Sequence, residues 1–192
     1  MPRKAKFSQK DVISAAVEIT EQSGFKSLTA RSLGEKLESS SRPVFTAFKN
    51  MEEVCSGVKD RAEEIYKSYI ESGLKETPSF KGVGKAYIRF ASERPQLFRL
   101  LFMRENGEIP SLDSVLGKID GNFAKILNSI TANYPVGSET ALNIYKHLWI
   151  YSHGIAVLTV TKVCAFGENE ISEMLTEVFK SLLKNSIGEK ND

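Results

Sequence analysis

Hydroxyl groups and cations are concentrated in a short stretch near the start of the chain: Thr29, Ser41, Arg42, Thr46 and Lys49. Lysine and hydroxyl side chains are suited to hydrogen bonding with phosphate groups. An arginine can donate to phosphate or, with two parallel hydrogen bonds, to guanine. These residue types predict contact with a phosphate-bearing polymer, provided that the fold presents them on one surface.

The distribution of charge supports the same interpretation. The whole chain of 192 residues has a net charge of +2, but residues 1–50 hold nine Lys or Arg and five Asp or Glu. Residues 51–192 hold 17 basic and 19 acidic residues. A basic first segment on a faintly acidic remainder indicates a polyanionic partner for the first segment.

Catalytic chemistry is not indicated. An enzyme would need a nucleophile with a base, paired carboxylates, a metal cluster or a phosphate-binding loop. The chain has two histidines and no glycine-rich nucleotide motif, so we predict no catalytic residue, metal site or cofactor. Cys55 and Cys164 lack metal-ligand spacing; a long-range disulfide is one alternative, but two free thiols are expected.

The chain is expected to be soluble and cytoplasmic. Its basic start leads into a charged segment rather than into the apolar segment of a signal peptide. The longest uncharged run, His147 to Thr161, is shorter than the roughly 20 residues that span a bilayer. No membrane partner is therefore predicted.

Helical periodicity runs through nearly the whole chain. Ser8 is a suitable N-cap with Asp11 three residues later, and the first helix is expected to end at Gly24 in a left-handed cap. A long helix is expected from Met51 to about Ser72, ending at Gly73. Further helices are expected at about 79–92, 95–103, 111–132, 138–165 and 168–186.

The segment between these first two helices predicts a helix-turn-helix unit. Thr29 caps a short second helix, a polar break follows at 38–41, and a third helix spans about 41–48 with Pro43 in its first turn. In such a unit the third helix presents its outer face to the major groove. That outer face consists of Ser41, Arg42, Phe45, Thr46 and Lys49, whereas Val44 and Phe48 face inward.

The motifs Gly24-Phe25, Thr29–Gly34, Ser40 and Val44–Asn50, followed by Glu52-Glu53-Val54, resemble the DNA-binding domain of the TetR family. The resemblance covers about residues 8–55 without a gap. It implies a homodimeric repressor that binds an operator in double-stranded DNA and is released by a small-molecule effector. The DNA-binding residues that we predict on this basis are Thr29, Arg31, Ser41, Arg42, Pro43, Phe45, Thr46 and Lys49.

Three positions depart from the family pattern. The family usually has a tyrosine that contacts phosphate where this chain has Phe45, which lacks the hydroxyl group. Glu38 stands where glycine is usual, and it is strained if the backbone there needs a positive φ. Pro43 occupies a position that often carries a base-contacting side chain.

A second resemblance lies in the remainder of the chain. The segments Trp149–Leu158 and Pro95–Phe102 are similar to the effector domain of a TetR subgroup that carries a Trp-x-x-x-His-Gly motif. Trp149 and His153 are four residues apart and share a helix face. We predict a largely apolar effector site lined by Phe90, Phe98, Phe102, Met103, Phe123, Trp149 and His153, with ordinary core packing as the alternative for each residue.

A subunit interface is predicted from the last two helices. From Gly154 to Ala165 the chain is apolar nearly all round a helix, interrupted only by threonines and Lys162, so this segment must be buried on several sides. Together with the final helix it could form a four-helix dimer interface. The apolar residues of that final helix include Ile171, Leu175, Val178, Phe179 and Leu182.

The sequence therefore predicts an all-α protein with a three-helix DNA-binding domain at residues 1–50 and a helical effector-binding and dimerisation domain at 51–192. The long helix from Met51 joins the two and would transmit the effect of ligand. The predicted function is a ligand-responsive transcriptional regulator, most simply a repressor. The alternative is a helical ligand-binding scaffold without specific DNA binding, which salt-dependent duplex binding would distinguish.

Overall fold

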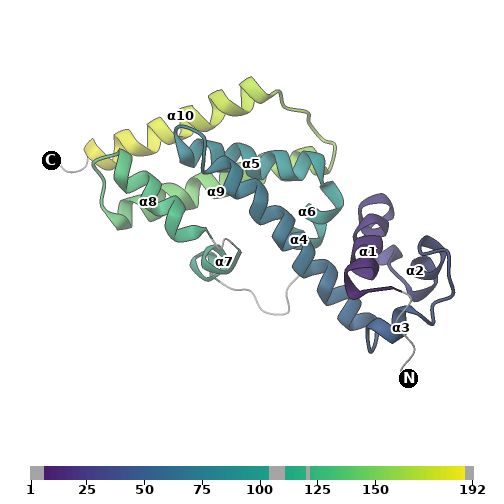
Figure 1. The fold of residues 1–192 in the computed structure, drawn as a ribbon. Helices are drawn as coiled ribbons and strands as arrows, with labels where there is room; N and C mark the ends of the chain where they lie inside the picture. Colours follow the sequence, from purple (N-terminus) through teal and green to yellow (C-terminus); the bar gives the residue numbers. More distant parts are fainter. Residues whose placement is uncertain (1–6, 104–110, 120–121, 189–192) are drawn as a thin grey trace. The chain divides into compact units, whose positions relative to one another are not determined.

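The computed structural model describes residues 7–103, 111–119 and 122–188 (Figure 1). Within these ranges the regular structure is entirely helical, which confirms the predicted all-α class. None of the described helices is long and apolar enough to cross a membrane. The α-helices are α1 (Gln9–Ser23), α2 (Ala30–Lys36), α3 (Val44–Ala47), α4 (Met51–Gly73), α5 (Ser79–Glu93), α6 (Pro95–Phe102), α7 (Leu112–Ile119), α8 (Phe123–Asn133), α9 (Ser138–Val160) and α10 (Glu168–Gly188), with a short 3-10 turn, η1, at Phe25–Ser27.

The chain forms two compact units, and each is described by itself. The first consists of Met1–Ile65 and Arg94–Arg104, and the second consists of Tyr66–Glu93 and Glu105–Asp192. Helix α4 therefore begins in one unit and ends in the other. This division differs from the predicted boundary at residue 50, because the first part of α4 and all of α6 pack within the first unit. The two domains themselves remain a prediction.

Helix α1 begins as its capping residues predict. The backbone N–H of Asp11 donates to the Ser8 hydroxyl at 3.2 Å, and the backbone N–H of Ser8 donates to the Asp11 carboxylate at 2.8 Å. The Ser8 hydroxyl also donates to this carboxylate at 2.7 Å, and this bond, together with that of the Ser8 N–H, holds the pKa of Asp11 below its ordinary value. The helix ends before Gly24, but the expected left-handed cap is wrong. Gly24 has φ 82° and ψ 158°, an extended conformation at positive φ that glycine alone adopts readily.

Helix α2 begins with a second capping box. The Thr29 hydroxyl accepts from the Ser32 N–H at 3.1 Å, and the Thr29 N–H donates to the Ser32 hydroxyl at 2.9 Å. The turn after α2 confirms the expected strain at Glu38, which has φ 48°. Gly34 of α2 allows this turn to approach closely, since a Cβ there would lie 2.9 Å from the backbone oxygen of Ser39. The turn is therefore defined both by the positive φ of Glu38 and by the close packing of its backbone on Gly34.

Helix α3 is shorter than the predicted span of 41–48. Its regular turn begins at Val44 and ends at Ala47, with Pro43 in the N-cap position and Phe48 in an extended conformation. Val44 is fully buried and Phe48 is half-buried, as expected for inward-facing residues. The Gln9 side chain donates to the backbone oxygen of Ala47 at 2.9 Å and so ties the end of α3 to α1.

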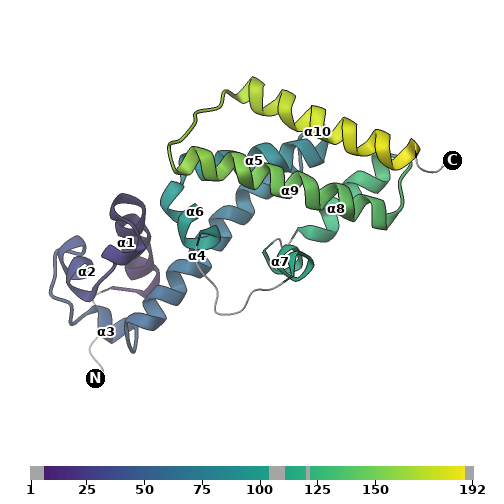
Figure 2. The same cartoon turned by 180° about the vertical axis from the view of Figure 1, so that it is seen from behind.

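The second unit is built on three neighbouring helices. Helices α5, α9 and α10 run alongside one another, and α8 packs on α5 and α9 (Figures 1 and 2). Ile88, Ile155 and Leu175 form an apolar cluster, one residue from each of the three helices. The rings of Phe80 and Phe179 stack with centroids 3.7 Å apart and join α5 to α10.

Two predicted helices have different bounds. The span 111–132 contains two helices, α7 and α8, with Asn122 as the N-cap residue of α8. Helix α9 ends at Val160 rather than at 165, because Lys162 adopts a left-handed φ of 59°. The Val163 N–H then donates to the backbone oxygen of Leu158 and the Lys162 N–H to that of Thr159, which is a Schellman closure. Residues 104–110, between the helices predicted at 95–103 and 111–132, lie outside the described residues.

Candidate functional sites

The first candidate site is the surface around α2 and α3. Most of the residues predicted there are accessible: Thr29, Arg31, Arg42, Phe45, Thr46 and Lys49 are exposed, whereas Ser41 and Pro43 are half-buried. Phe45 exposes 45% of its surface, while Val44 beside it is fully buried. The short helix therefore turns one apolar residue inward and presents the aromatic ring with the polar residues outward.

The cations of this surface differ in how they are paired. Arg31 Nε lies 2.9 Å from a Glu35 carboxylate oxygen, and Lys49 Nζ lies 3.8 Å from Glu53, both as exposed pairs. Such pairs contribute little stability, so a phosphate group can replace the carboxylate at small cost. Arg42 forms no ion pair with any described residue. The predicted basic residues at positions 3, 4 and 6 lie outside the described part of the chain.

The hydroxyl groups of this surface are partly engaged within the protein. Thr29 uses its hydroxyl to cap α2, as described above, so its oxygen is already an acceptor. The Thr46 hydroxyl lies 3.4 Å from the backbone oxygen of Arg42, a long and weak hydrogen bond. Thr46 is therefore more available for an outside partner than Thr29 is.

The residues predicted to line an effector site are divided between the two units. Phe98, Phe102 and Met103 belong to the first unit, where α6 packs on α1. Phe98 is fully buried there, with its ring centroid 5.1 Å from that of Phe102. The ion pair of Arg94 with Glu21 at 2.7 Å holds the start of α6 against α1. These contacts are typical of a hydrophobic core rather than of a ligand-binding site.

The other four predicted residues, Phe90, Phe123, Trp149 and His153, belong to the second unit. Phe90 is fully buried against the rings of Tyr66 and Tyr69, with centroids 5.5 and 5.3 Å away. The Phe123 ring contacts Tyr145 edge-on at 5.6 Å. Of these four residues, Trp149 lines a cavity of this unit, and the His153 imidazole stacks on its indole.

This cavity, the aromatic cavity, lies between α4, α5 and α9. It has a volume of about 20 Å³, enough for about one water molecule. Its walls are mostly aromatic and aliphatic, and no charged residue is among the described residues that line it: Tyr66, Phe80, Val83, Gly84, Tyr87, Tyr145, Leu148, Trp149 and Ser152. Tyr87 was not among the residues predicted from the sequence, although Phe80, Val83 and Tyr87 have the spacing of one helix face.

Three side chains form an ordered group beside the aromatic cavity. The Tyr87 hydroxyl and His153 Nδ1 are 2.9 Å apart and share a hydrogen bond. The indole of Trp149 stacks on the His153 imidazole, with centroids 5.1 Å apart and an interplanar angle of 8°. Burial raises the pKa of Tyr87 well above its ordinary value and lowers the pKa of His153, so both groups are uncharged at neutral pH.

The indole nitrogen of Trp149 is the unusual atom of this group. It is buried, and no described residue accepts a hydrogen bond from its N–H. A buried donor without an acceptor costs about 1–3 kcal/mol, so native proteins rarely leave one in place. Trp149, which lines the aromatic cavity, therefore carries a buried donor that has no acceptor among the described residues.

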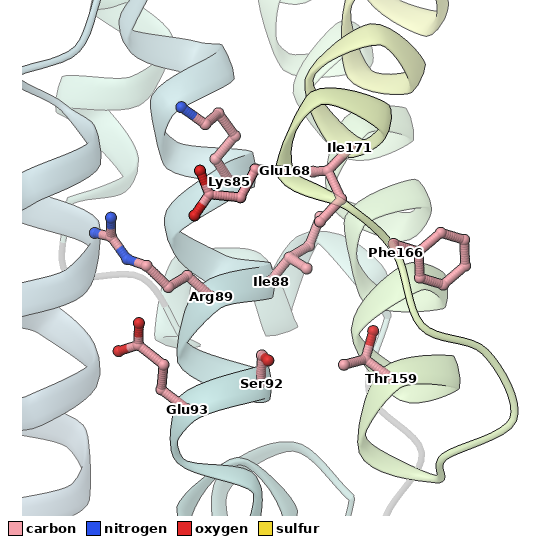
Figure 3. Close-up of a pocket in the computed structure, with 9 residues that line it drawn as sticks. All are labelled: Lys85, Ile88, Arg89, Ser92, Glu93, Thr159, Phe166, Glu168 and Ile171. Atoms are coloured by element: carbon pink, nitrogen blue, oxygen red, sulfur yellow. The ribbon is translucent and has the colours of Figure 1, made fainter.

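A second cavity of about 190 Å³ lies between α5 and the start of α10 (Figure 3). Ile88 and Ile171 form part of its apolar wall, and the charged side chains of α5 line its rim (Figure 3). These charged groups already have partners: Lys85 pairs with Glu76 at 2.8 Å, and Arg89 donates to the Ser72 hydroxyl at 2.8 Å. Tyr69 donates to Glu93 at 2.6 Å, so Lys85 has a counter-charge, whereas Arg89 and Glu93 have uncharged hydrogen-bond partners.

Metal-binding chemistry has no visible basis in the described part of the chain. No group of three or more His, Cys, Asp or Glu side chains is close enough there to hold an ion. Cys55 and Cys164 are both free thiols, as the sequence analysis expected. Burial raises the pKa of Cys55, which makes this thiol less reactive.

Comparison with known protein families gives one match. A family model described as "Tetracyclin repressor-like, C-terminal domain" matches residues 80–183, more than half of the chain. The match runs from α5 into α10 and so includes the aromatic cavity's α5 and α9 walls. A search of curated proteins found no match.

Proposed function

Because this chain belongs to the tetracycline repressor-like family, whose members are transcriptional regulators with a ligand-binding domain, we propose that it binds a palindromic DNA operator as a homodimer and represses transcription there. A small, largely apolar effector bound by the second unit lowers the affinity for the operator. Four parts of this proposal rest on separate observations: the DNA contact, the dimer, the effector site and their coupling.

The DNA contact rests on α3 and its flanking residues, and this is the observation that carries the proposal. Arg42 is exposed and has no ion-pair partner among the described residues, so it is available to donate to guanine or phosphate. Lys49 and Arg31 are held only by exposed ion pairs. Phe45 has no hydroxyl group, so its contact with DNA is apolar.

The dimer rests on an exposed apolar stripe of α9. Ile150 exposes 51% and Leu158 37% of its surface, and Gly154 lies between them at one-turn spacing. A Cβ on Gly154 would meet no atom within 4 Å, so a second helix can approach closely at this point. On α10, Leu175 and Phe179 are buried within their own unit, whereas Ile171, Val178 and Leu182 are half-buried and remain available to the proposed interface.

The effector site is the aromatic cavity rather than the larger one. Three charged side chains that line the larger cavity, Lys85, Arg89 and Glu93, are engaged in contacts within the chain, as described above. The aromatic cavity has apolar walls with a few polar groups, which is typical of small-molecule sites. Tyr66 of α4 lines it, and the same helix begins at Met51, directly after the residues proposed to contact DNA.

Coupling between the two sites requires a difference in affinity. Dimeric helix-turn-helix proteins place their recognition helices about 34–36 Å apart, one turn of DNA. An effector that binds more tightly to a dimer with another spacing shifts the population towards that second conformation. The size of the shift is limited by the difference between the effector's affinities for the two conformations. Helix α4 is the continuous element through which such a shift would pass.

Selection of duplexes from a random pool tests the proposal. The protein should enrich a palindromic site, and Arg42→Ala should weaken binding to it by about tenfold or more. Lys67→Ala removes an exposed cation of α4 in the second unit and serves as the matched control, with little expected change. Failure to enrich any sequence, together with intact ligand binding, would instead support a ligand-binding scaffold.

A further inference from the structure

The buried indole N–H of Trp149 indicates what kind of molecule the aromatic cavity takes. We propose that this N–H donates a direct hydrogen bond to the effector, and that the effector is an uncharged molecule with an apolar ring that carries a hydrogen-bond acceptor. A carbonyl oxygen or a ring nitrogen would meet this requirement. The inference deepens the proposed function and rests on it for the role of the cavity.

The first argument is the missing acceptor. No described residue accepts from Trp149 Nε1, although the atom is buried. A ligand that supplies an acceptor gains a hydrogen bond and also removes the cost of the unpaired donor. A site of this kind discriminates strongly against an analogue that lacks the polar atom. The indole therefore provides specificity in a cavity whose other contacts are mostly apolar.

The second argument is that the neighbouring polar group is already engaged. The Tyr87 hydroxyl bonds to His153 Nδ1 at 2.9 Å, and the imidazole stacks under the indole. This arrangement holds the indole in one orientation. Of the three side chains in the group, Trp149 is the one with a buried polar atom that has no partner among the described residues.

The third argument concerns charge. The described residues that line the cavity include no Lys, Arg, Asp or Glu. An ion placed there would lose its hydration without gaining a counter-charge, which is strongly unfavourable. An uncharged ligand avoids this cost, and the faces of Tyr66, Phe80 and Tyr145 provide apolar contact for a ring.

The fourth argument concerns size. The cavity of about 20 Å³ holds about one water molecule, so a six-membered ring enters only if side chains of the wall move outward. Tyr66 on α4, Phe80 on α5 and Tyr145 on α9 are the wall residues whose side chains would move. Ligand binding at this cavity is thus linked to a displacement of wall side chains on α4, α5 or α9.

The test uses the fact that the chain contains a single tryptophan. The full-length ¹⁵N-labelled protein therefore gives one indole N–H resonance, which reports on Trp149 alone. Pyridine and benzene serve as probes, because they have nearly the same size and differ in one acceptor atom. Pyridine should shift the indole proton downfield in a saturable manner and bind at least tenfold more tightly than benzene. Equal affinities, or an unmoved indole resonance with pyridine, would overturn the proposal.

Two further measurements sharpen the test. Trp149→Phe keeps an aromatic ring but lacks the donor, so pyridine should lose its preference over benzene in ligand-observed NMR; a preserved preference would overturn the proposal. If this variant does not fold, the titration of the unsubstituted protein still decides. Tetramethylammonium is the charged probe, and binding as tight as that of pyridine would contradict an uncharged ligand.

These readouts do not involve DNA, so the two proposals can fail separately. A downfield shift with pyridine in a protein that selects no duplex would support the donor and overturn the regulatory role. A protein that selects an operator but shows no pyridine preference would retain the regulatory role and lose the donor.

Discussion

The Tyr87 hydroxyl lies 2.9 Å from Nδ1 of His153, and this hydrogen bond joins α5 to α9 in the second unit. The two residues are 66 positions apart in sequence. Trp149 stacks on the imidazole that Tyr87 orients. The position of the indole in the aromatic cavity therefore depends on a residue of another helix.

Tyr87→Phe is expected to lower the free energy of unfolding by about 1–2 kcal/mol, because His153 Nδ1 loses its partner in a largely buried position. Denaturant unfolding followed by circular dichroism measures the change. Tyr69→Phe is the matched control, since it removes a hydroxyl that donates to the exposed carboxylate of Glu93. The loss should be smaller there; equal losses in both variants would contradict the role of the Tyr87 bond.

The stability of the protein should fall as the pH falls below neutrality, in part because of His153. Burial lowers the pKa of His153 in the folded state, so the unfolded chain binds a proton at higher pH than the folded one does. The uncharged imidazole therefore contributes its full share to the free energy of unfolding above the ordinary histidine pKa of 6.5. This share is lost as the pH falls from 6.5 towards the lower pKa that His153 has in the folded protein. His153→Gln should lose less stability than the unsubstituted protein between pH 7.5 and pH 5.5, as measured by urea unfolding. A loss of the same size in both proteins would show that His153 does not contribute.

Glu38→Gly should stabilise the first unit by about 1 kcal/mol. Glu38 has φ 48°, in the left-handed region where glycine avoids the steric cost of a Cβ. Glu35→Gly, three residues earlier in α2, is the control that should have the opposite effect. Glycine inside a helix lowers the free energy of unfolding by about 1 kcal/mol. Thermal unfolding of both variants should move in opposite directions, and a fall in both midpoints would show that the turn is not strained.

Leu158→Glu combined with Ile150→Glu should convert the proposed dimer into a monomer. Each substitution places a carboxylate on the exposed apolar stripe of α9, where a dimer would bury it without a partner. Sedimentation equilibrium measures the mass in solution. Lys125→Glu changes an exposed residue of α8 and should leave the mass unchanged. A dimer that survives the double substitution would place the interface elsewhere.

Local signals were sufficient to predict where many helices begin and end. Ser8 with Asp11 and the N-cap at Thr29 act through hydrogen bonds within three residues, so the sequence contains both partners of each bond. Glu38 could be identified as strained because glycine is usual at its position in the family. The exposed outer face of α3 followed from the inward position of Val44.

Features that depend on distant contacts could not be predicted in the same way. Phe98 and Phe102 belong to the first unit because α6 packs on α1, and no local pattern in α6 reports its partner. The apolar run after Gly154 suggested a helix to residue 165, but the left-handed conformation of Lys162 ends α9 at Val160. Tyr87 was missed because its partner, His153, lies on another helix.

The measurement that tests the central claim most directly is binding of the full-length protein to the DNA that flanks its own gene, at 50 mM and 200 mM salt. If Arg31, Arg42, Lys49 and their neighbours contact phosphate groups in a dimer, affinity for one sequence should be tight and should fall by about a thousandfold or more between the two conditions. Specific binding should also exceed binding to an unrelated duplex of equal length by about a thousandfold. Affinity that is weak, independent of sequence and indifferent to salt would contradict the account of a DNA-binding regulator.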